Sequence, residues 1–265
     1  MFKITTLASG SSGNCLAVSD GTTHILIDAG ISARRITTAL KGLGIDPGTL
    51  AAVLVTHEHS DHIAGLATLT KQIPVPIYTA GPTGRQLCYR IAGLQDRVHG
   101  FQPGETFSIG GLEIGTFPTQ HDCACPVGYS VTDRHGVKMA LATDLGVVTQ
   151  AVREGIQGAS LLVAEANYDV ETLRWGSYPP FLKERILSDR GHLSNEMGGA
   201  LALFAVEQGA RNIVLGHLSK ENNTPGLAYA AVEQTLTGGG VRVGADVVLS
   251  VASRSTCEGW IEVKR

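Results

Sequence analysis

The sequence reads T-H-E-H-S-D-H from Thr56 to His62, directly after an apolar run that predicts a buried strand, Ala51–His57 (AAVLVTH). Three imidazoles and the carboxylate of Asp61 lie within the six residues from His57 to His62. Imidazole nitrogen and carboxylate oxygen are the ligands that divalent ions such as zinc and manganese take in proteins. A tight loop that carries several of them lowers the entropy cost of ordering a site. The segment therefore predicts a metal-binding loop at the end of a strand.

Four other apolar runs also end in a carboxylate or an imidazole. They are Thr23–Asp28 (THILID), Leu112–His121 (LEIGTFPTQH), Lys138–Asp144 (KMALATD) and Asn212–His217 (NIVLGH). A nearly continuous apolar run predicts a strand buried on both faces, so its last polar residue emerges at the rim of the sheet, where a ligand can reach it. One loop cannot complete a catalytic metal site, so His121, Asp144 and His217 are candidates for the remaining ligands. We expect one shared site.

The length and composition predict one folded domain over residues 1–265. Hydrophobic residues make up 43% of the chain and charged residues 17%, which excludes a disordered protein. Short strand-like runs alternate with longer amphipathic stretches, which is the pattern of a mixed α/β domain. The expected helices are Ile63–Lys71, Pro82–Ala92, Val147–Glu154, Tyr178–Leu187, Asn195–Gln208 and Pro225–Leu236.

The charge balance is slightly acidic, because 21 lysines and arginines face 24 aspartates and glutamates, giving a formal net charge of −3. A wholly basic nucleic-acid-binding surface is therefore excluded, whereas a local basic patch is not. The chain has no apolar run of about 18 residues and no secretory type of apolar segment near its start, so we predict a cytoplasmic protein that does not enter the membrane. Five cysteines, an odd number, favour reduced thiols.

The order of these residues along the chain resembles the metallo-β-lactamase superfamily. The residues that carry the resemblance are Asp28, the motif His57-x-His59-x-Asp61-His62, and then His121, Asp144 and His217. Four further segments resemble the bacterial YycJ/WalJ-type branch of that superfamily, which is associated with exonuclease-like activity on DNA. They are Leu7–Asn14 (LASGSSGN), Tyr178–Asp189 (YPPFLKERILSD), Gly191–Asn195 (GHLSN) and Gly216–Pro225 (GHLSKENNTP).

The resemblance implies a four-layer αββα sandwich, of the α/β (α+β) class, with two divalent metal ions per chain, zinc or manganese, at one edge. A hydroxide that bridges the two ions would be the nucleophile. Asp28 would orient the metal-binding loop; the alternative for Asp28 is a plain turn aspartate. The implied ligands are His57, His59 and His121 for the first ion, Asp61, His62 and His217 for the second, and Asp144 as a bridge between the two.

His192 is the predicted proton donor. It stands just before Ser194, a favourable N-cap for a helix that begins near Asn195, and a helix N-terminus attracts anions. The resemblance implies that His192 contacts the scissile phosphate and protonates the leaving oxygen. Together with the metal ligand Asp61 it makes up the predicted catalytic residues. The alternative is that His192 is a surface residue of the capping region.

Substrate contacts are predicted at Lys183, Arg185 and Ser194. One or two cations can anchor a backbone phosphate in a protein that is acidic overall, but a cluster of mixed charge is equally typical of a solvated helix face. Cys123 and Cys125 follow His121 closely, so they either approach the metals as thiolates or serve in redox sensing or packing.

The sequence therefore favours a metal-dependent phosphodiesterase or exonuclease whose substrate is nucleic acid, in the first place DNA, with a role in DNA repair or processing. Two alternatives stay open. A thioester or lactone hydrolase would share the motif from His57 to His62 but would not need an acid such as His192. A non-catalytic metal-binding module would keep the fold without turnover. The sequence also leaves the oligomeric state open.

Overall fold

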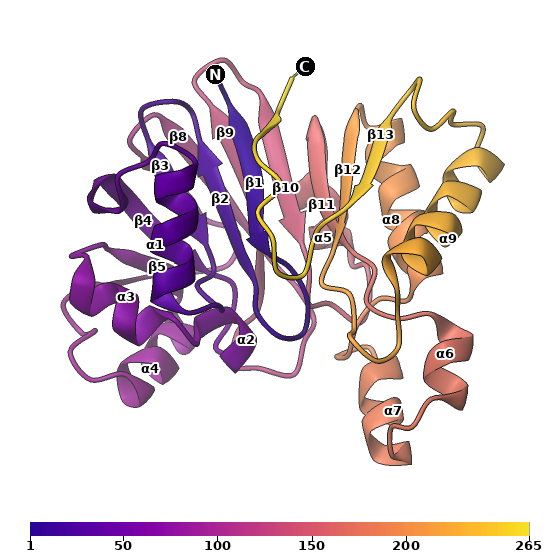
Figure 1. Cartoon of the computed structure of the whole chain (residues 1–265), viewed down its shortest axis with the longest axis horizontal. Helices are drawn as coiled ribbons and strands as arrows, with labels where there is room; N and C mark the ends of the chain where they lie inside the picture. Colours follow the sequence, from indigo (N-terminus) through magenta and orange to yellow (C-terminus); the bar gives the residue numbers. More distant parts are fainter. Residues whose placement is uncertain (265) are drawn as a thin grey trace.

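Two seven-stranded mixed sheets pack face to face in the computed structural model, which describes residues 1–264 (Figure 1). The first sheet has the order β14 (Ile261–Glu262), β1 (Lys3–Ala8), β2 (Cys15–Ser19), β3 (His24–Ile27), β4 (Leu50–Val55), β5 (Ile77–Ala80) and β6 (Val98–Phe101). The second has the order β13 (Val248–Val251), β12 (Asn212–Gly216), β11 (Leu161–Glu165), β10 (Lys138–Ala142), β9 (Val127–Asp133), β8 (Leu112–Pro118) and β7 (Thr106–Ile109).

Helices cover the outer face of each sheet, which completes four layers and confirms the predicted αββα sandwich. On the first sheet lie α1 (Ala33–Gly42), α3 (Leu66–Gln72) and α4 (Gly81–Arg90). Two short helices, η1 (Pro47–Thr49) and α2 (Ser60–Ile63), come before and after β4 in the chain. On the second lie α5 (Gln150–Ile156), α8 (Asn195–Glu207) and α9 (Pro225–Gly238). Within residues 1–264, no helix has both the length and the apolar character needed to cross a membrane.

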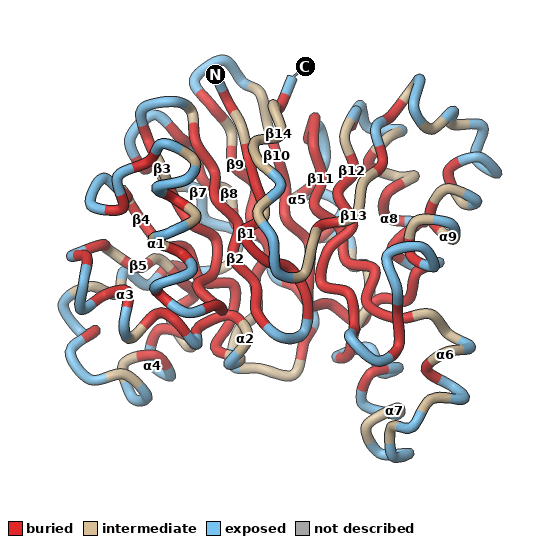
Figure 2. Tube along the Cα trace, viewed as in Figure 1, coloured by how far each residue is buried: buried red, intermediate tan, exposed pale blue. Residues whose placement is uncertain are grey.

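The strands are apolar on both faces because each face has its own core. In β3, Ile25 and Ile27 belong to the core between the sheets, whereas Leu26 packs under the helices of the first sheet. In β11, Leu161 belongs to the core between the sheets, whereas Leu162 packs under the helices of the second sheet. Figure 2 shows the resulting buried centre with exposed residues around it. This double burial explains why the sequence runs are continuous rather than alternating.

Helix α1 is absent from the sequence prediction, although its signals are present. Ser32 caps its first turn, where the hydroxyl accepts from Arg35 N at 3.4 Å. Its buried residues Ala33, Ile36 and Leu40 follow the spacing of a helix with one apolar face. The six helices expected from the sequence are all present, with α2 and α3 replacing the single one predicted over Ile63–Lys71.

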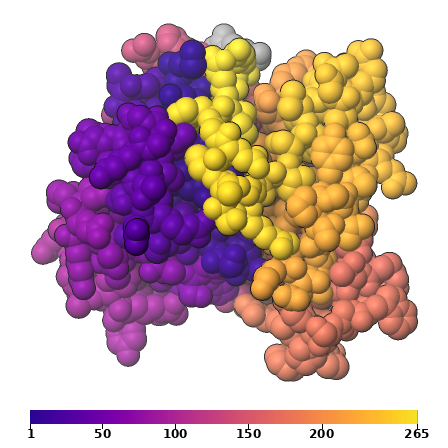
Figure 3. Space-filling model, viewed as in Figure 1, coloured from indigo at the N-terminus to yellow at the C-terminus, as the bar shows by residue number. Residues whose placement is uncertain are grey.

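The chain returns to the first sheet at its end. After β13 in the second sheet, the C-terminal residues (yellow in Figure 3) cross the front of the molecule, and β14 pairs antiparallel with β1. A second excursion leaves the sandwich between β11 and α8. It consists of α6 (Val170–Trp175) and α7 (Pro180–Leu187), projects beyond the sheets in Figure 1, and is called the 170–187 arm below.

The carboxyl ends of the relevant strands lie along one edge of the sandwich. Strands β3 and β4 are parallel in the first sheet, and β10, β11 and β12 are parallel in the second. Strand β8 runs in the direction of β10, since both pair antiparallel with β9. The polar residues that follow these strands are therefore brought to a common edge, as the strand-end pattern predicted.

Candidate metal centre

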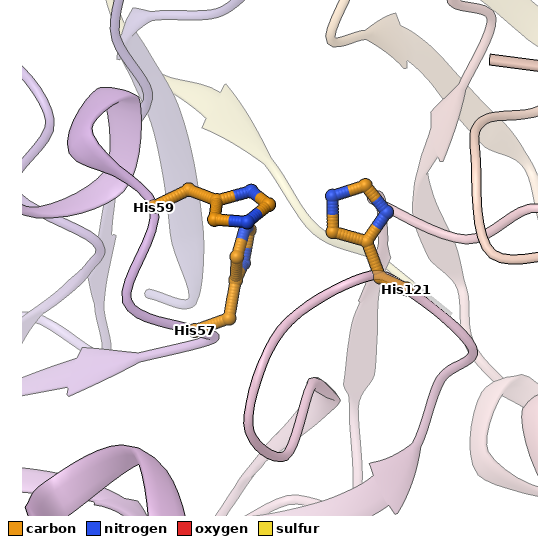
Figure 4. Close-up of side chains that lie close together, drawn as sticks. All are labelled: His57, His59 and His121. Atoms are coloured by element: carbon orange, nitrogen blue, oxygen red, sulfur yellow. The ribbon is translucent and has the colours of Figure 1, made fainter. Parts of the chain in front are cut away.

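Three imidazoles from two separate loops form the first cluster (Figure 4). His57 and His59 lie between β4 and α2, and His121 follows β8. Their ring centroids are 4.6 Å apart for His57 and His59, 5.0 Å for His59 and His121, and 5.2 Å for His57 and His121. One nitrogen from each ring lies within 4.8 Å of the others, so the three can hold one ion.

A second cluster joins Asp61, His62 and His217, which can also hold one ion. Asp61 Oδ2 lies 3.4 Å from His62 Nε2 and 3.3 Å from His217 Nε2. The side chain of Asn14 reaches the same place, with Nδ2 3.1 Å from His62 Nε2 and 3.2 Å from Asp61 Oδ2. Asn14 has no predicted role in the sequence, because nothing marks a residue at the start of β2 as facing this edge.

Asp144 lies between the two clusters. Its Oδ2 is 3.4 Å from His62 Nε2, and its Oδ1 is 3.3 Å from His217 Nε2 and 3.9 Å from His121 Nε2. Among the described residues, Asp144 Oδ2 and His57 Nε2 are buried polar atoms without a hydrogen bond. Buried polar atoms normally have partners. These two, in a set of imidazoles and carboxylates, fit divalent cations such as zinc.

Four of the imidazoles are held at Nδ1, which leaves Nε2 for the cluster. His57 Nδ1 lies 3.0 Å from Thr56 Oγ1, His62 Nδ1 donates to Asp28 Oδ2 at 2.7 Å, and His121 Nδ1 donates to the carbonyl of Gly191 at 2.9 Å. His217 Nδ1 donates to Glu165 Oε1 at 3.0 Å. A partner at one ring nitrogen orients the other nitrogen toward a metal.

Asp28 lies where the predicted orienting role requires it. Besides His62, its carboxylate accepts from Thr56 N at 2.9 Å and from Thr56 Oγ1. Thr56 thereby links Asp28 to His57 as well. The sequence prediction assigns Thr56 no role, since only the three-dimensional arrangement brings the ends of β3 and β4 together.

Three residues of the centre have a left-handed backbone: Asp28 with φ 64°, Asp144 with φ 58° and His217 with φ 56°. They are the non-glycine residues with positive φ in the described chain. Each follows a strand directly or nearly so, and the turn aims its side chain at the cluster. Such conformations cost about 1–3 kcal/mol each and concentrate at functional sites.

Glu165 is a residue of the centre that the sequence prediction missed. It is fully buried at the end of β11, where Oε1 accepts from Nδ1 of both His192 and His217, at 2.8 and 3.0 Å. Its Oε2 accepts from the backbone N–H groups of Leu145 and Leu193. The signal was available, because the apolar run Leu161–Glu165 (LLVAE) ends in a carboxylate like the others.

The carboxylates of the centre shift the pKa values of its imidazoles. Burial by itself lowers the pKa of His217, but Asp144, Asp61 and Glu165 outweigh that effect and raise it to about 10. Burial also opposes the charge on His62, yet Asp144 and Asp28 raise the pKa of His62 well above its usual value. Without metal, the rings of His62 and His217 are therefore protonated on both nitrogens, and so positively charged, at neutral pH.

Metal loading at pH 7 should consequently release about two protons per chain, one each from His62 and His217, because a ligating imidazole nitrogen must be deprotonated. The proton from His217 should drop out of this count as pH rises through about 10, the pKa of that residue. Calorimetric titration with zinc in buffers of different ionisation enthalpy measures this number. A binding enthalpy independent of the buffer would contradict it.

A glycine permits the close approach of the Asp28 turn to the metal-binding loop. A Cβ on Gly30 would lie 1.6 Å from the carbonyl oxygen of Asp61 and 2.7 Å from Asn14 N. The neighbouring backbone bonds, Gly30 N to Asn14 O and Asn14 N to Asp61 O, are both 2.8 Å long. No side chain fits there without moving Asp61.

Gly30→Ala should therefore lower the free energy of unfolding by about 1–3 kcal/mol and weaken metal binding, because overpacking displaces the Asp61 backbone. Denaturant unfolding of the metal-free protein and a metal titration measure the two effects. Gly226→Ala is the matched control, since a Cβ at Gly226 in α9 meets nothing within 4 Å. Equal stability of the two variants would show that the close approach does not matter.

The predicted substrate contacts have other partners in the structure. Lys183 Nζ donates to the carbonyls of Arg174 and Gly176 at 2.8 and 2.7 Å, inside the 170–187 arm. Arg185 Nε donates to Asp122 Oδ2. Ser194 Oγ accepts from Met197 N at 3.2 Å and so caps α8 as expected. The two cations thus hold the arm and its junction with the metal-binding edge.

The thiols near His121 are in surroundings that keep them neutral. Burial, followed by the charge of Glu58, raises the pKa of both Cys123 and Cys125. Within the described chain, no group of residues arranged to hold a metal includes a cysteine. Packing is therefore the reading that the geometry favours for these two residues.

Comparison with known proteins gives the class to which this fold and site belong. A family model described as "Beta-lactamase superfamily domain" matches residues 23–218. The chain therefore belongs to the beta-lactamase superfamily, as the resemblance in its sequence predicted.

Two curated relatives give the particular branch. Exodeoxyribonuclease WalJ of Streptococcus pneumoniae serotype 2 is 37% identical over 265 residues, covering 99% of this chain and 98% of the relative. Exodeoxyribonuclease YycJ of Bacillus anthracis is 37% identical over 239 residues, covering 90% of each. Identity at this level over nearly the whole chain confirms the WalJ/YycJ-type branch.

Solved structures share the fold at low sequence identity. The metallo-beta-lactamase fold protein YhfI from Bacillus subtilis aligns with a TM-score of 0.73 at 18% identity, over 97% of this chain and 98% of its own. The short form of human tRNase Z aligns with a TM-score of 0.67 at 19% identity, over 99% and 100%. These likenesses support the architecture alone.

Proposed function

We propose that this protein is a metal-dependent exodeoxyribonuclease, which hydrolyses phosphodiester bonds from an end of DNA. The observation that carries the proposal is the position of His192 beside the two clusters. Its Nδ1 donates to the buried carboxylate of Glu165 and lies 3.9 Å from Asp144 Oδ1, and its ring centroid is 4.8 Å from that of His121. A hydrolase acting on a phosphodiester needs such an acid, because the leaving oxygen must be protonated.

The names of the relatives support the DNA substrate. The two relatives described above, each 37% identical to this chain, are named exodeoxyribonucleases. A more distant relative, ribonuclease Z of Mycobacterium marinum, is 30% identical in an alignment of 199 positions that covers 62% of this chain and 70% of the relative. Cleavage of a nucleic-acid backbone is the property that these names share.

The proposed ligands are His57, His59 and His121 for one ion, Asp61, His62 and His217 for the other, and Asp144 between them. Divalent ions held there supply an activated water and positive charge beside the phosphate. His192 gives a proton from Nε2 to the leaving oxygen. Glu165 fixes the ring through the hydrogen bond at Nδ1, which leaves Nε2 facing the substrate.

The fully buried Glu165 suits this role because it stays ionised. Burial alone raises the pKa of this carboxyl, but the charges and hydrogen bonds of His192 and His217 lower it well below its usual range. His192 is also the accessible member of the pair, with 17% of its side chain exposed against none for Glu165. Substrate can thus reach the imidazole while the carboxylate remains enclosed.

The test is hydrolysis of end-labelled single- and double-stranded DNA and RNA by the purified protein, loaded in turn with zinc, manganese or magnesium. We expect a ladder of products from one end of DNA, absent after chelation and restored by metal. Cleavage of RNA in preference to DNA would overturn the assignment to DNA. No cleavage of either polymer in any metal would overturn the nuclease itself.

The same preparation separates the two alternatives. A thioester hydrolase would turn over a glutathione thioester faster than a bis-aryl phosphodiester. A non-catalytic module would turn over neither, although it would still bind metal. We expect the phosphodiester to be the preferred substrate, because His192 has no part in expelling a thiolate.

A further inference from the structure

Asp122 faces the first cluster but is not among the seven proposed ligands. Its Oδ1 lies 3.4 Å from His121 Nε2 and 3.6 Å from His59 Nε2. In the described chain this oxygen is buried and accepts no hydrogen bond, although 30% of the side chain is exposed. A buried carboxylate oxygen without a donor is costly, so its position between two imidazoles calls for a physical reason.

His59 differs from the other imidazoles in how it is held. His57, His62, His121 and His217 each have a hydrogen-bond partner at Nδ1 and present Nε2 to the clusters. His59 instead has no hydrogen-bond partner at Nδ1 among the described residues, and its Nε2 lies 3.6 Å from Asp122 Oδ1.

The other oxygen of Asp122 is held from a distant part of the chain. Arg185 on α7 donates its Nε–H to Asp122 Oδ2, across 63 residues of sequence. Arg185 thereby fixes the rotamer that keeps Oδ1 between the two imidazoles.

We propose that Asp122 is a positioning residue for the first metal: with an ion bound, its Oδ1 would accept the Nε2–H of His59 and so leave Nδ1 of that ring for the ion, while Arg185 holds its Oδ2. The inference rests on the metal centre of the proposed function. A carboxylate on the distal nitrogen of a ligating histidine fixes the ring and increases its basicity. The 170–187 arm is thereby coupled to the first metal, and Arg185 acts through Asp122 instead of on substrate phosphate.

Metal affinity measured without substrate tests this directly. Asp122→Ala should weaken binding of one of the two ions about 10- to 100-fold, the usual effect of removing such a partner. Arg185→Ala should weaken the same ion by less. The double variant should be no weaker than Asp122→Ala, because the two residues act in series. Asp122→Asn, which keeps an acceptor oxygen without the charge, should fall between Asp122→Ala and the unaltered protein.

A chromophoric chelator in competition gives the affinities, and the visible spectrum of the cobalt-loaded protein reports the ligand field of each ion. We expect the bands of one cobalt ion to shift in Asp122→Ala, with the melting temperature of the metal-free protein unchanged. Arg174→Ala is the matched control, since Arg174 pairs with Glu171 on the same arm. Its metal affinity should equal that of the unaltered protein.

Three results would overturn the inference. The first is unchanged metal affinity in Asp122→Ala. The second is an additive loss in the double variant, which would mean that Arg185 acts independently. The third is a raised KM for DNA in Arg185→Ala with normal metal affinity, which would make Arg185 a phosphate contact. The first two results are measured without DNA, so they are distinct from a failure of the nuclease assay.

Discussion

Replacing Asp144 by asparagine should reduce DNA hydrolysis by about 1,000-fold or more, the largest effect that we expect of any single substitution. Asp144 lies 3.4 Å from His62 Nε2 and 3.3 Å from His217 Nε2 in the second cluster, and its Oδ1 lies 3.9 Å from His121 Nε2 in the first. Losing its charge removes a shared anionic ligand, and several kcal/mol of transition-state stabilisation corresponds to a rate factor of about this size.

The kinetic loss should be accompanied by a loss of bound metal, which elemental analysis of the dialysed protein measures. Asp133→Asn is the matched control, because Asp133 is also a buried aspartate but sits at the end of β9, where it accepts from the N–H groups of His135 and Val137. We expect Asp133→Asn to retain both metal and activity. Full metal content and turnover in Asp144→Asn would contradict the bridging role.

His192→Ala should lower the rate of DNA hydrolysis about 100- to 10,000-fold while both ions stay bound, because it removes general acid catalysis and not a ligand. The loss should depend on the leaving group. A phosphodiester with a nitrophenol leaving group needs little protonation, so the variant should hydrolyse it at nearly the normal rate. The ratio of the two rates, compared between the variant and the unaltered protein, isolates the acid role.

Two outcomes would contradict that role. One is an equal loss on DNA and on the nitrophenyl ester, which would mean that His192 stabilises charge or structure. The other is a drop in metal content, since His192 can also join Asp144, Glu165 and His217 in a group that holds an ion. Glu165→Gln offers a further comparison: it should lower the rate of DNA hydrolysis by removing the carboxylate that orients His192 through Nδ1.

Much of the metal centre follows from local sequence. His57, His59, Asp61 and His62 lie within one loop, so their proximity is nearly a property of the covalent chain. His121, Asp144 and His217 could be predicted because parallel strands present their carboxyl ends at one edge. The same rule extends to Glu165 at the end of β11, which was overlooked because its run, LLVAE, had no histidine or aspartate to mark it.

Other residues of the centre could not be found in this way. Asn14 and Thr56 contribute short polar side chains of types that occur throughout the chain, and only the packing of β2, β3 and β4 brings them to the edge. Lys183 and Arg185 are cations in a segment of mixed charge, and their partners are decided by how the 170–187 arm folds back.

The sequence by itself determined the class of fold, the edge at which the site lies and the ligand types, because hydrophobic periodicity and strand ends are local properties of the chain. Tertiary structure alone decided the orientation of each ligand. The left-handed turns at Asp28, Asp144 and His217, the Glu165 carboxylate between two imidazoles, and the Arg185–Asp122 pair across 63 residues all depend on contacts between distant segments. Such contacts form only when burial brings those segments together, so no local pattern encodes them.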